Sequence, residues 1–175
     1  MHLMLARAAS GQVSGVGADA PGPRAPRYRV TVVEPRHHRR EFATRLGADE
    51  VSSPEEFQAE GQFDAAILAV GVTDLVGLAF HAVRKMGKVS LFAGFDVGAS
   101  TCIDPNSIHY KQIRVTGASE SRRRDFAEAL ALVASGRIDP SPLITARLTL
   151  AHHQQAFRLA GDGSALKVAF KLLPT

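Results

Sequence analysis

The chain of 175 residues has a net charge of +4, with 45% hydrophobic and 22% charged residues, which is the composition of an ordinary globular protein. Its single cysteine, Cys102, excludes an internal disulfide framework and any zinc site built from several cysteines, and it favours a reduced, cytoplasmic compartment. No apolar run approaches the roughly 20 residues of a transmembrane helix, and the apolar start of the chain lacks the basic region of a signal peptide, so we expect no membrane partner.

Arginines occur in two short clusters, Arg39-Arg40 and residues 122–124. Such clusters are found in nucleic-acid-binding patches. Few aromatic residues lie near them to stack on bases, however, and the acidic residues Glu41 and Asp125 adjoin them. We therefore expect solvated helix faces and no nucleic-acid partner.

Residues 1–27 precede the alternation of strand-like and helix-like segments that begins at residue 28. Its first nine residues, MHLMLARAA, are apolar on nearly every side and predict the last turns of a buried helix, although no N-cap residue precedes them. Residues 10–27 are rich in Gly, Ala, Pro and Ser without any period, which predicts a flexible connector.

From residue 28 onward, apolar strand-like runs alternate with segments of helical spacing. The expected strands are 30–33, 48–51, 63–70, 88–93 and 113–117, with a short edge strand at 100–104. The expected helices are 37–46, 53–56, 74–86 and one that begins at Ser121 and carries Phe126, Leu130 and Val133. A strand at 143–150, a helix around 152–159 and a strand at 167–173 complete the chain. This alternation predicts an α/β fold with a doubly wound parallel sheet.

An acidic residue, Glu34, directly follows the run Val30–Val33, which is typical of a buried parallel strand. In a dinucleotide-binding βαβ unit, a carboxylate at the end of the second strand accepts hydrogen bonds from the adenosine ribose. Many surface strands also end in an acid, so the meaning of Glu34 depends on the segments around it.

Five segments together resemble the coenzyme-binding half of the zinc-type medium-chain alcohol and polyol dehydrogenases, nearest to the sorbitol and threonine dehydrogenase branch. They occur in the order and at the spacing of that family: VTVVEP…RR…A…RLGADEV (30–51), FDAAILAVGV (63–72), GKVSLFAGF (87–95), IDPNSIHYKQIRVTGA (103–118) and DFAEALALVASGRIDPSPLIT (125–145). The resemblance implies a Rossmann-like fold and an oxidoreductase family that acts on CH–OH groups with NAD and catalytic zinc.

The resemblance also implies which residues would bind the cofactor. Glu34 would bind the adenosine ribose and repel a 2′-phosphate, which favours NAD over NADP, and Arg36 or Arg39 would flank the adenine. Arginine after the strand can also accommodate a 2′-phosphate, so that alternative stays open. The rest of the coenzyme would be lined by Val70, Gly71, Val72, Ala93, Gly94, Phe95, Ala118 and Ser119. The alternative role of the glycines is to end helices and strands.

The zinc-binding part of the family pattern is missing. Catalytic zinc needs three protein ligands and an open position for water. Cys102 and the seven scattered histidines offer no such set, and the adjacent pairs His37-His38 and His152-His153 point in different directions on a helix. We therefore expect neither metal ligands nor catalytic residues in this chain.

The first strand of the nucleotide fold and its glycine loop are missing as well, so the predicted fold is incomplete. Gly15–Ala20 fits G-x-G-x-x-A but lacks the strand before it and the helix after it. In the strand order 3-2-1-4-5-6, the missing strand leaves a gap of roughly 10 Å between its neighbours. Either the sheet splits or rearranges, or another segment fills the gap, and the candidates are Gln12–Val16 and Lys167–Leu173.

These expectations divide the chain into a remnant helix with its connector (1–27), a truncated NAD-binding domain (28–142) and a segment that completes the catalytic domain in the family (143–175). The leading interpretation is the NAD(H)-binding portion of a dehydrogenase, without catalysis of its own. One alternative is a non-catalytic dimerising or partner-binding module, in which the edge strand 100–104 pairs with its twin across a two-fold axis. Another is an active enzyme whose catalytic half is a separate chain.

Without a catalytic domain, apolar residues would be exposed at Leu148, Leu150, Phe157 and Phe170.

Overall fold

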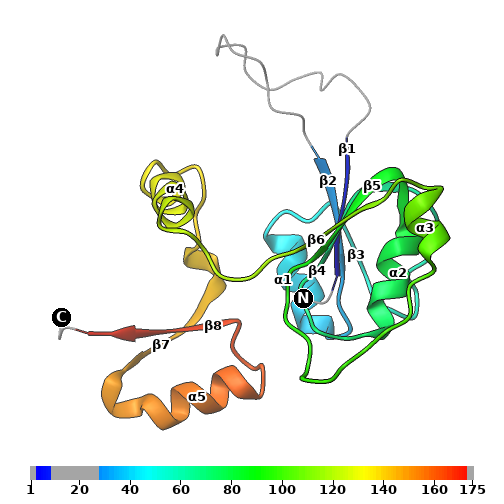
Figure 1. The fold of residues 1–175 in the computed structure, drawn as a ribbon. Coiled ribbons are helices and arrows are strands. Elements are labelled where there is room, and N and C mark those ends of the chain that lie inside the picture. The colour runs from blue at the N-terminus through cyan, green and yellow to red at the C-terminus, as the bar shows by residue number, and fades with distance from the viewer. Residues whose placement is uncertain (1–2, 9–27, 173–175) are drawn as a thin grey trace. The chain divides into compact units, whose positions relative to one another are not determined.

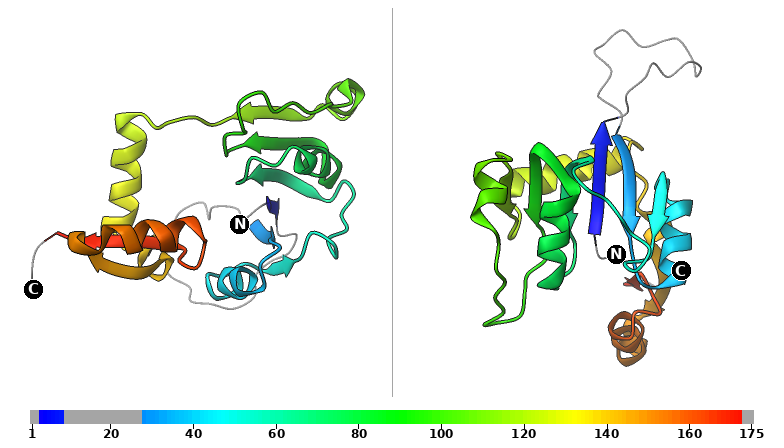
Figure 2. Two further views of the ribbon diagram at one scale, coloured as in Figure 1. Left: turned by 90° about the horizontal axis from the view of Figure 1, so that it is seen from below. Right: turned by 90° about the vertical axis from the view of Figure 1, so that its right-hand side faces the viewer.

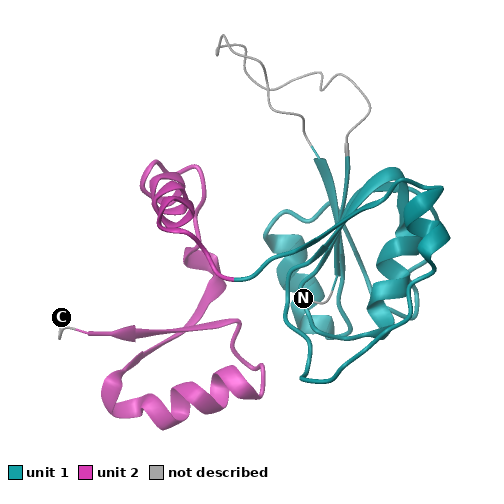
Figure 3. Ribbon diagram, viewed as in Figure 1, with its two compact units in different colours: residues 1–119 teal, residues 120–175 magenta. Residues whose placement is uncertain are grey.

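The computed structural model describes residues 3–8 and 28–172. The chain divides into two compact units, unit 1 (Met1–Ser119) and unit 2 (Glu120–Thr175), which are coloured separately in Figure 3. The boundary that the family resemblance predicts after residue 142 lies inside unit 2. Within the described residues, no helix is both long and apolar enough to cross a membrane.

Unit 1 is built on a six-stranded sheet of order β3-β2-β1-β4-β5-β6 (Figure 1). Its strands are β1 (Leu3–Ala8), β2 (Tyr28–Val33), β3 (Glu50–Ser52), β4 (Phe63–Leu68), β5 (Val83–Leu91) and β6 (Arg114–Gly117). All neighbouring pairs are parallel except the two that involve β1. The expected α/β sheet is therefore present, as a mostly parallel mixed sheet.

Strand β1 occupies the central position of the sheet, where the sequence left a gap (Figure 2). It runs antiparallel to both neighbours, and Leu3 pairs with the last residue of β2, Val33, and the last residue of β4, Leu68. The prediction of a helix over residues 1–9 was therefore wrong. A short apolar run does not distinguish a buried helix from a buried strand. Here the segment is a strand because it pairs with β2 on one side and β4 on the other.

Two other segments were proposed to fill the gap, and the structure describes one of them. Lys167–Lys171 forms β8, which pairs in a different sheet, so that candidate was wrong. Gln12–Val16 and the glycine stretch Gly15–Ala20 lie outside the described residues. The central position itself belongs to β1.

Helices cover both faces of the unit 1 sheet. Helix α1 (His37–Arg45) lies on one face, and α2 (Asp74–Ala82) and the short α3 (Pro105–His109) lie on the other (Figure 1). Helix α2 ends four residues earlier than expected, because the chain becomes extended at Val83 and enters β5. Two other expectations were wrong: residues 54–56 form a turn, and residues 101–104 form no strand.

The core of unit 1 lies between the sheet and α2. Alternate residues of β1, Leu3 and Leu5, are fully buried in this core, whereas Met4 on the other face is only half-buried beside α1. The remaining buried members of the cluster are Val33, Phe63, Ala66, Leu68, Val76, Ala79, Phe80, Ala82, Val83, Val89 and Ile113. On the opposite face, α1 buries Ala43, while Leu46, which follows the helix, is 41% exposed.

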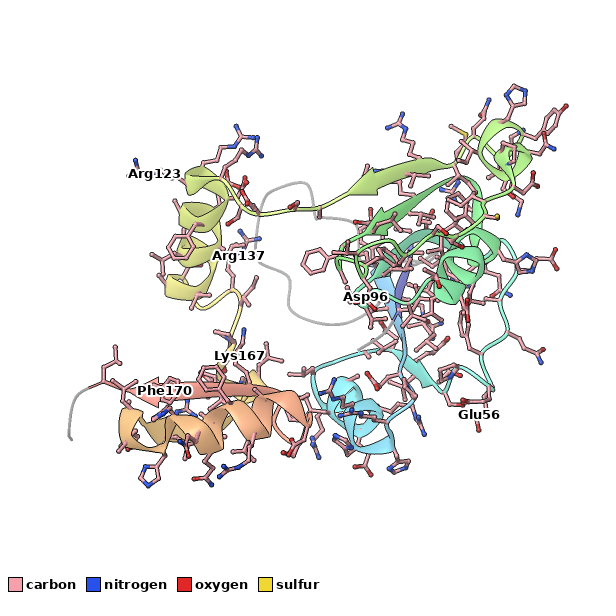
Figure 4. The ribbon with its side chains drawn as sticks, turned by 60° about the horizontal axis from the view of Figure 1, so that its bottom comes forward. Glu56, Asp96, Arg123, Arg137, Lys167 and Phe170 are labelled. Atoms are coloured by element: carbon pink, nitrogen blue, oxygen red, sulfur yellow. The ribbon has the colours of Figure 1, made fainter. Side chains whose placement is uncertain are left out.

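Unit 2 contains little buried surface. Its elements are α4 (Arg123–Ala134), a 3-10 turn (Ser141–Leu143), β7 (Ile144–Thr149), a second 3-10 turn (Leu150–His152), α5 (His153–Gly161) and β8 (Lys167–Lys171). Strands β7 and β8 form a two-stranded parallel sheet, and Figure 4 labels Phe170 on β8 and Arg123 at the start of α4. The buried apolar residues are Ala156 and Ala165, whereas Leu150 and Phe157 are exposed, as expected, and Leu148 and Phe170 are half-buried.

Candidate functional site

The predicted site residues follow the ends of β2, β4, β5 and β6. Because these four strands are parallel, their ends lie at one edge of the sheet, the carboxyl edge, where ligands bind in open α/β sheets. Glu34 directly follows β2, and Gly71 and Gly94 lie in the segments after β4 and β5. The fold thus brings the predicted residues to a common edge, and the geometry of each decides what it can do.

Glu34 is fully buried, with 0% of its side chain exposed. Its backbone N–H donates to Ser52 O at 3.0 Å, which extends the pairing of β2 and β3 by one residue. Its carboxylate oxygen Oε1 accepts the backbone N–H of Arg36 at 3.0 Å. The carboxylate is therefore held at the strand tip by the first turn of the chain that follows it, and it has no surface open to a ligand in this conformation.

A basic segment, Arg36 to Arg40, follows the tip of β2. Arg36 is exposed and serves as the N-cap residue of α1, and Arg39 and Arg40 are half-buried in its first turn. Nη1 of Arg40 donates to the carbonyl oxygens of Glu34 and Pro35, each at 2.7 Å. We did not include Arg40 among the predicted site residues, although its position next to Arg39 in the Arg-Arg pair was a signal for it.

Gly71 and Gly94 are in close contact. A Cβ atom at Gly71 would lie 2.1 Å from the carbonyl oxygen of Gly94 and 3.0 Å from Cα of Phe95. Only glycine allows these two segments to approach so closely. Gly71 therefore has a packing role that needs no ligand, whereas a Cβ atom at Gly94 would meet nothing within 4 Å.

Backbone hydrogen bonds fix the other predicted residues after β4, β5 and β6. The N–H of Ala93 donates to Leu68 O at 3.0 Å, and the N–H of Ala118 donates to Leu91 O at 3.1 Å. Phe95 packs partly against the core. Val72, Gly94, Ala118 and Ser119 are exposed, and Val70, Gly71, Ala93 and Phe95 are half-buried. This part of the edge is accessible to a ligand, in contrast to the carboxylate of Glu34.

The direction of β1 decides how well a dinucleotide fits. In the Rossmann arrangement, the central strand runs toward the carboxyl edge and leads into a helix whose N-terminus binds the pyrophosphate. Here β1 starts at that edge, at Leu3, and ends at the opposite edge, at Ala8, beside Tyr28. Among the described residues, no helix follows the central strand at the carboxyl edge, and α2 begins with the acidic Asp74. Within the part of the chain that the structure describes, the edge therefore presents no such cradle for a pyrophosphate.

His37, His152 and His153 contact residues close to them in the chain. Nδ1 of His37 lies 3.6 Å from Oε1 of Glu41, one helical turn away. Nδ1 of His152 lies 2.9 Å from the hydroxyl of Thr149, and Nδ1 of His153 lies 3.1 Å from Leu150 O. Across residues 3–8 and 28–172, the structure shows no group of three or more His, Cys, Asp or Glu side chains that could hold a metal ion.

A mostly parallel sheet of this order, with an acidic residue directly after its second strand, defines an α/β domain of the Rossmann type. The chain belongs to the zinc-binding dehydrogenase family, whose model matches residues 24–135. Its relatives include D-arabinitol dehydrogenase 1 of Uromyces fabae, which is 27% identical over 109 residues, or 62% of this chain and 31% of the relative.

Solved structures show the same fold. L-Idonate 5-dehydrogenase from Escherichia coli K-12 is 23% identical, with a TM-score of 0.72 over 81% of this chain and 42% of that chain. A zinc-binding dehydrogenase from Sinorhizobium meliloti 1021, solved bound to NADP, is 22% identical, with a TM-score of 0.67 over 72% of this chain and 40% of that chain. The chain spans less than half the length of these enzymes, consistent with their coenzyme-binding portion.

Proposed function

We propose that this chain is the nucleotide-binding portion of a zinc-type alcohol or polyol dehydrogenase and has no catalytic activity of its own. The observation that carries the proposal is the carboxyl edge, where the tip of β2, the Gly71–Gly94 contact and the open residues after β4, β5 and β6 converge. The ligand would be a nicotinamide nucleotide, with its adenosine end at β2 and its nicotinamide end at β4 and β5.

The roles of the residues follow from their geometry. The segment after β2 would bind the adenosine end, and Val72, Ala93 and Gly94 would contact the nicotinamide end through backbone and apolar surface. When bound, the nicotinamide ring supplies the hydride acceptor of the family's reaction. No described cluster of side chains could hold a zinc ion beside it, so substrate oxidation would require groups from a second polypeptide.

A titration of NADH with the full chain tests the proposal. The chain contains no tryptophan, so the emission of NADH itself must be followed. We expect a saturable enhancement that 5′-AMP reverses, because AMP would compete for the adenosine end. A flat titration would contradict the proposal.

Two matched variants locate the site. Val72 and Val133 are 39% and 40% exposed, but Val133 lies on α4 in unit 2, whereas Val72 follows β4 in unit 1. We expect Val72→Glu to weaken NADH binding by about tenfold, because it adds a negative charge beside a negatively charged ligand. Val133→Glu should bind NADH like the unmodified chain. Equal binding by both variants would place the nucleotide elsewhere.

The second candidate function is a non-catalytic module that dimerises or binds a partner. The exposed apolar residues of unit 2 favour it, since Phe126 and Phe157 are 67% and 72% exposed. The strand expected at residues 100–104 is absent, so a dimer through that strand loses its structural basis. A dimer in light scattering that dissociates in the double variant Phe126→Ser/Phe157→Ser, together with a flat NADH titration, would favour this function over nucleotide binding.

A further inference from the structure

We propose that unit 1 has a second binding site, for a small organic anion with an aromatic or apolar body. It lies at the amino edge of the sheet, where β2, β4 and β5 begin, opposite to the carboxyl edge. A hollow of about 430 Å³ is present there, lined by residues of β1, β2, β4 and β5. A volume of this size is within the range of sites that hold small organic ligands. The inference does not depend on the proposed function.

The floor of the hollow belongs to the face of the sheet that turns away from α2. Ala6 pairs with Ala65, which pairs with Lys88, so these three side chains lie on one face. The adjacent residues Leu5 and Ala66 point to the other face, where they are fully buried in the core beneath α2. Ala6 and Ala65 are only half-buried. The two alanines therefore give the hollow an apolar floor with little bulk above it.

An irregularity in β5 forms one wall of the hollow. The register of β5 against β4 shifts between Phe63 and Ala65, so the stretch of β5 after Val83 bulges. Within this bulge Met86 has a φ of +63°, a conformation that residues with a side chain rarely adopt, and its N–H donates to Lys111 O at 2.7 Å. The Met86 side chain is 65% exposed and lines the hollow. Strained backbone of this kind is concentrated at functional sites, and a flexible thioether is suited to contact an aromatic or apolar ligand.

The charges around the hollow favour an anion. The carboxylate in its lining, Asp64, accepts a hydrogen bond from Nε of Arg84 at 2.7 Å, and Nη1 of Arg84 donates to Lys85 O at 2.8 Å. The ammonium of Lys88 makes no hydrogen bond or ion pair with any residue that the structure describes. The residue paired with Lys88 on β6 is a second cation, Arg114, and like charges at this spacing repel. An anion bound at Lys88 would reduce this repulsion and give the ammonium an acceptor.

Tyr28 defines the other end of the hollow. Its side chain is 49% exposed and adds an aromatic ring to the lining. A ligand with its carboxylate at Lys88 and its body over Ala6 and Ala65 would therefore contact apolar surface from Tyr28 and Met86. An inorganic anion would use the charge alone and leave this apolar surface uncovered.

Two aromatic probes of the same shape test the inference on the full chain. We expect 2-naphthoate to bind about tenfold more tightly than 2-naphthamide, because only the carboxylate makes a charge-assisted hydrogen bond with Lys88. Two-dimensional NMR of the ¹⁵N-labelled chain locates each probe and gives its dissociation constant. We expect the backbone amides of Ala6, Ala65, Met86 and Lys88 to shift first.

Variants assign the effect to one lysine. Lys88→Gln should weaken 2-naphthoate binding by about tenfold and leave 2-naphthamide binding unchanged, whereas Lys88→Arg, which keeps the charge, should retain most of the affinity. Lys85→Gln is the matched control, since Lys85 is an exposed lysine of the same strand whose side chain does not line the hollow. It should bind 2-naphthoate like the unmodified chain.

Each other outcome would overturn the inference and leave the proposed function to its own test. Absence of binding, or equal binding of the two probes, would show that the hollow does not select an organic anion. Equal losses in Lys88→Gln and Lys85→Gln would show a general effect of surface charge. Shifts confined to the carboxyl edge would place 2-naphthoate at the proposed nucleotide site instead.

Discussion

Units 1 and 2 are built from the same kinds of segments, yet only unit 1 has a developed core. Helix α2 buries Val76, Ala79, Phe80 and Ala82 against the sheet. Helix α4 is longer and carries Phe126, Leu130 and Val133 at helical spacing, but it buries no residue. The comparison teaches that apolar periodicity predicts a helix with an apolar face, while burial of that face depends on what the rest of the chain provides.

The comparison is tested most directly by truncating one phenylalanine in each unit. Phe80 is 4% exposed and Phe126 is 67% exposed. We expect Phe80→Ala to lower the free energy of unfolding by about 3–5 kcal/mol, through lost burial and the cavity left behind. Phe126→Ala should change it by less than about 0.5 kcal/mol. Urea denaturation measures both, and a large loss for Phe126→Ala would mean that α4 is covered in solution.

The central strand of unit 1 gives the next largest effect. Leu5 is fully buried and Met4, its neighbour on the other face of β1, is half-buried. We expect Leu5→Ala to cost about 2–5 kcal/mol, and Met4→Ala to cost distinctly less. Thermal or urea unfolding gives both values. Equal, small costs for the two variants would show that β1 does not occupy the core in solution.

The close contact between glycines gives an intermediate effect. Gly71→Ala would place Cβ 2.1 Å from the carbonyl oxygen of Gly94, so we expect a loss of about 1–3 kcal/mol as the two segments move apart. Gly77 is the control, because it lies in α2 and a Cβ atom there would meet nothing within 4 Å. Gly77→Ala should stabilise unit 1 by about 0.5–1 kcal/mol. A neutral Gly71→Ala variant would contradict the contact.

The smallest effect concerns the start of α4. The Arg122 side chain donates two hydrogen bonds to Asp125, at 2.9 and 3.0 Å, and holds the pKa of that carboxyl below its usual value of 3.8. Because the pKa is lower in the folded state, this contribution to stability is complete above about pH 3.8 and is lost as the pH falls through the lowered value. An NMR titration of the Asp125 carboxyl measures it, with Arg122→Ala as the variant that should restore the usual value. Titration of Asp125 at or above 3.8 in the unmodified chain would contradict the contact.

The sequence was sufficient to predict the parallel part of the fold. The runs that became β2, β4, β5 and β6 are bounded by helix-like segments and turn residues, so their strand character follows from local pattern. Pattern could not predict β1, because LMLARA reads equally well as a buried helix, and its strand state depends on partners far along the chain at Val33 and Leu68. Length alone could not have settled the ambiguity.

The site shows a similar limit. The position of Glu34 at the end of a strand follows from the sequence, as does the presence of arginines after it. The burial of its carboxylate and the placement of Arg40 on two carbonyl oxygens depend on how the turn into α1 folds back, which no local pattern encodes. Likewise, the Gly71–Gly94 contact joins two glycines that the sequence places apart.

The double pairing of β1 also bears on how the protein would behave if it were trimmed. A chain that began at Tyr28 would lack β1, so the backbone N–H and C=O groups of β2 and β4 that now bond to β1 would have no partner. Both strands would become exposed edge strands, and such strands pair with strands of other molecules. A shortened form should therefore be prone to self-association, and a peptide with the sequence of residues 3–8 supplied in excess should suppress it.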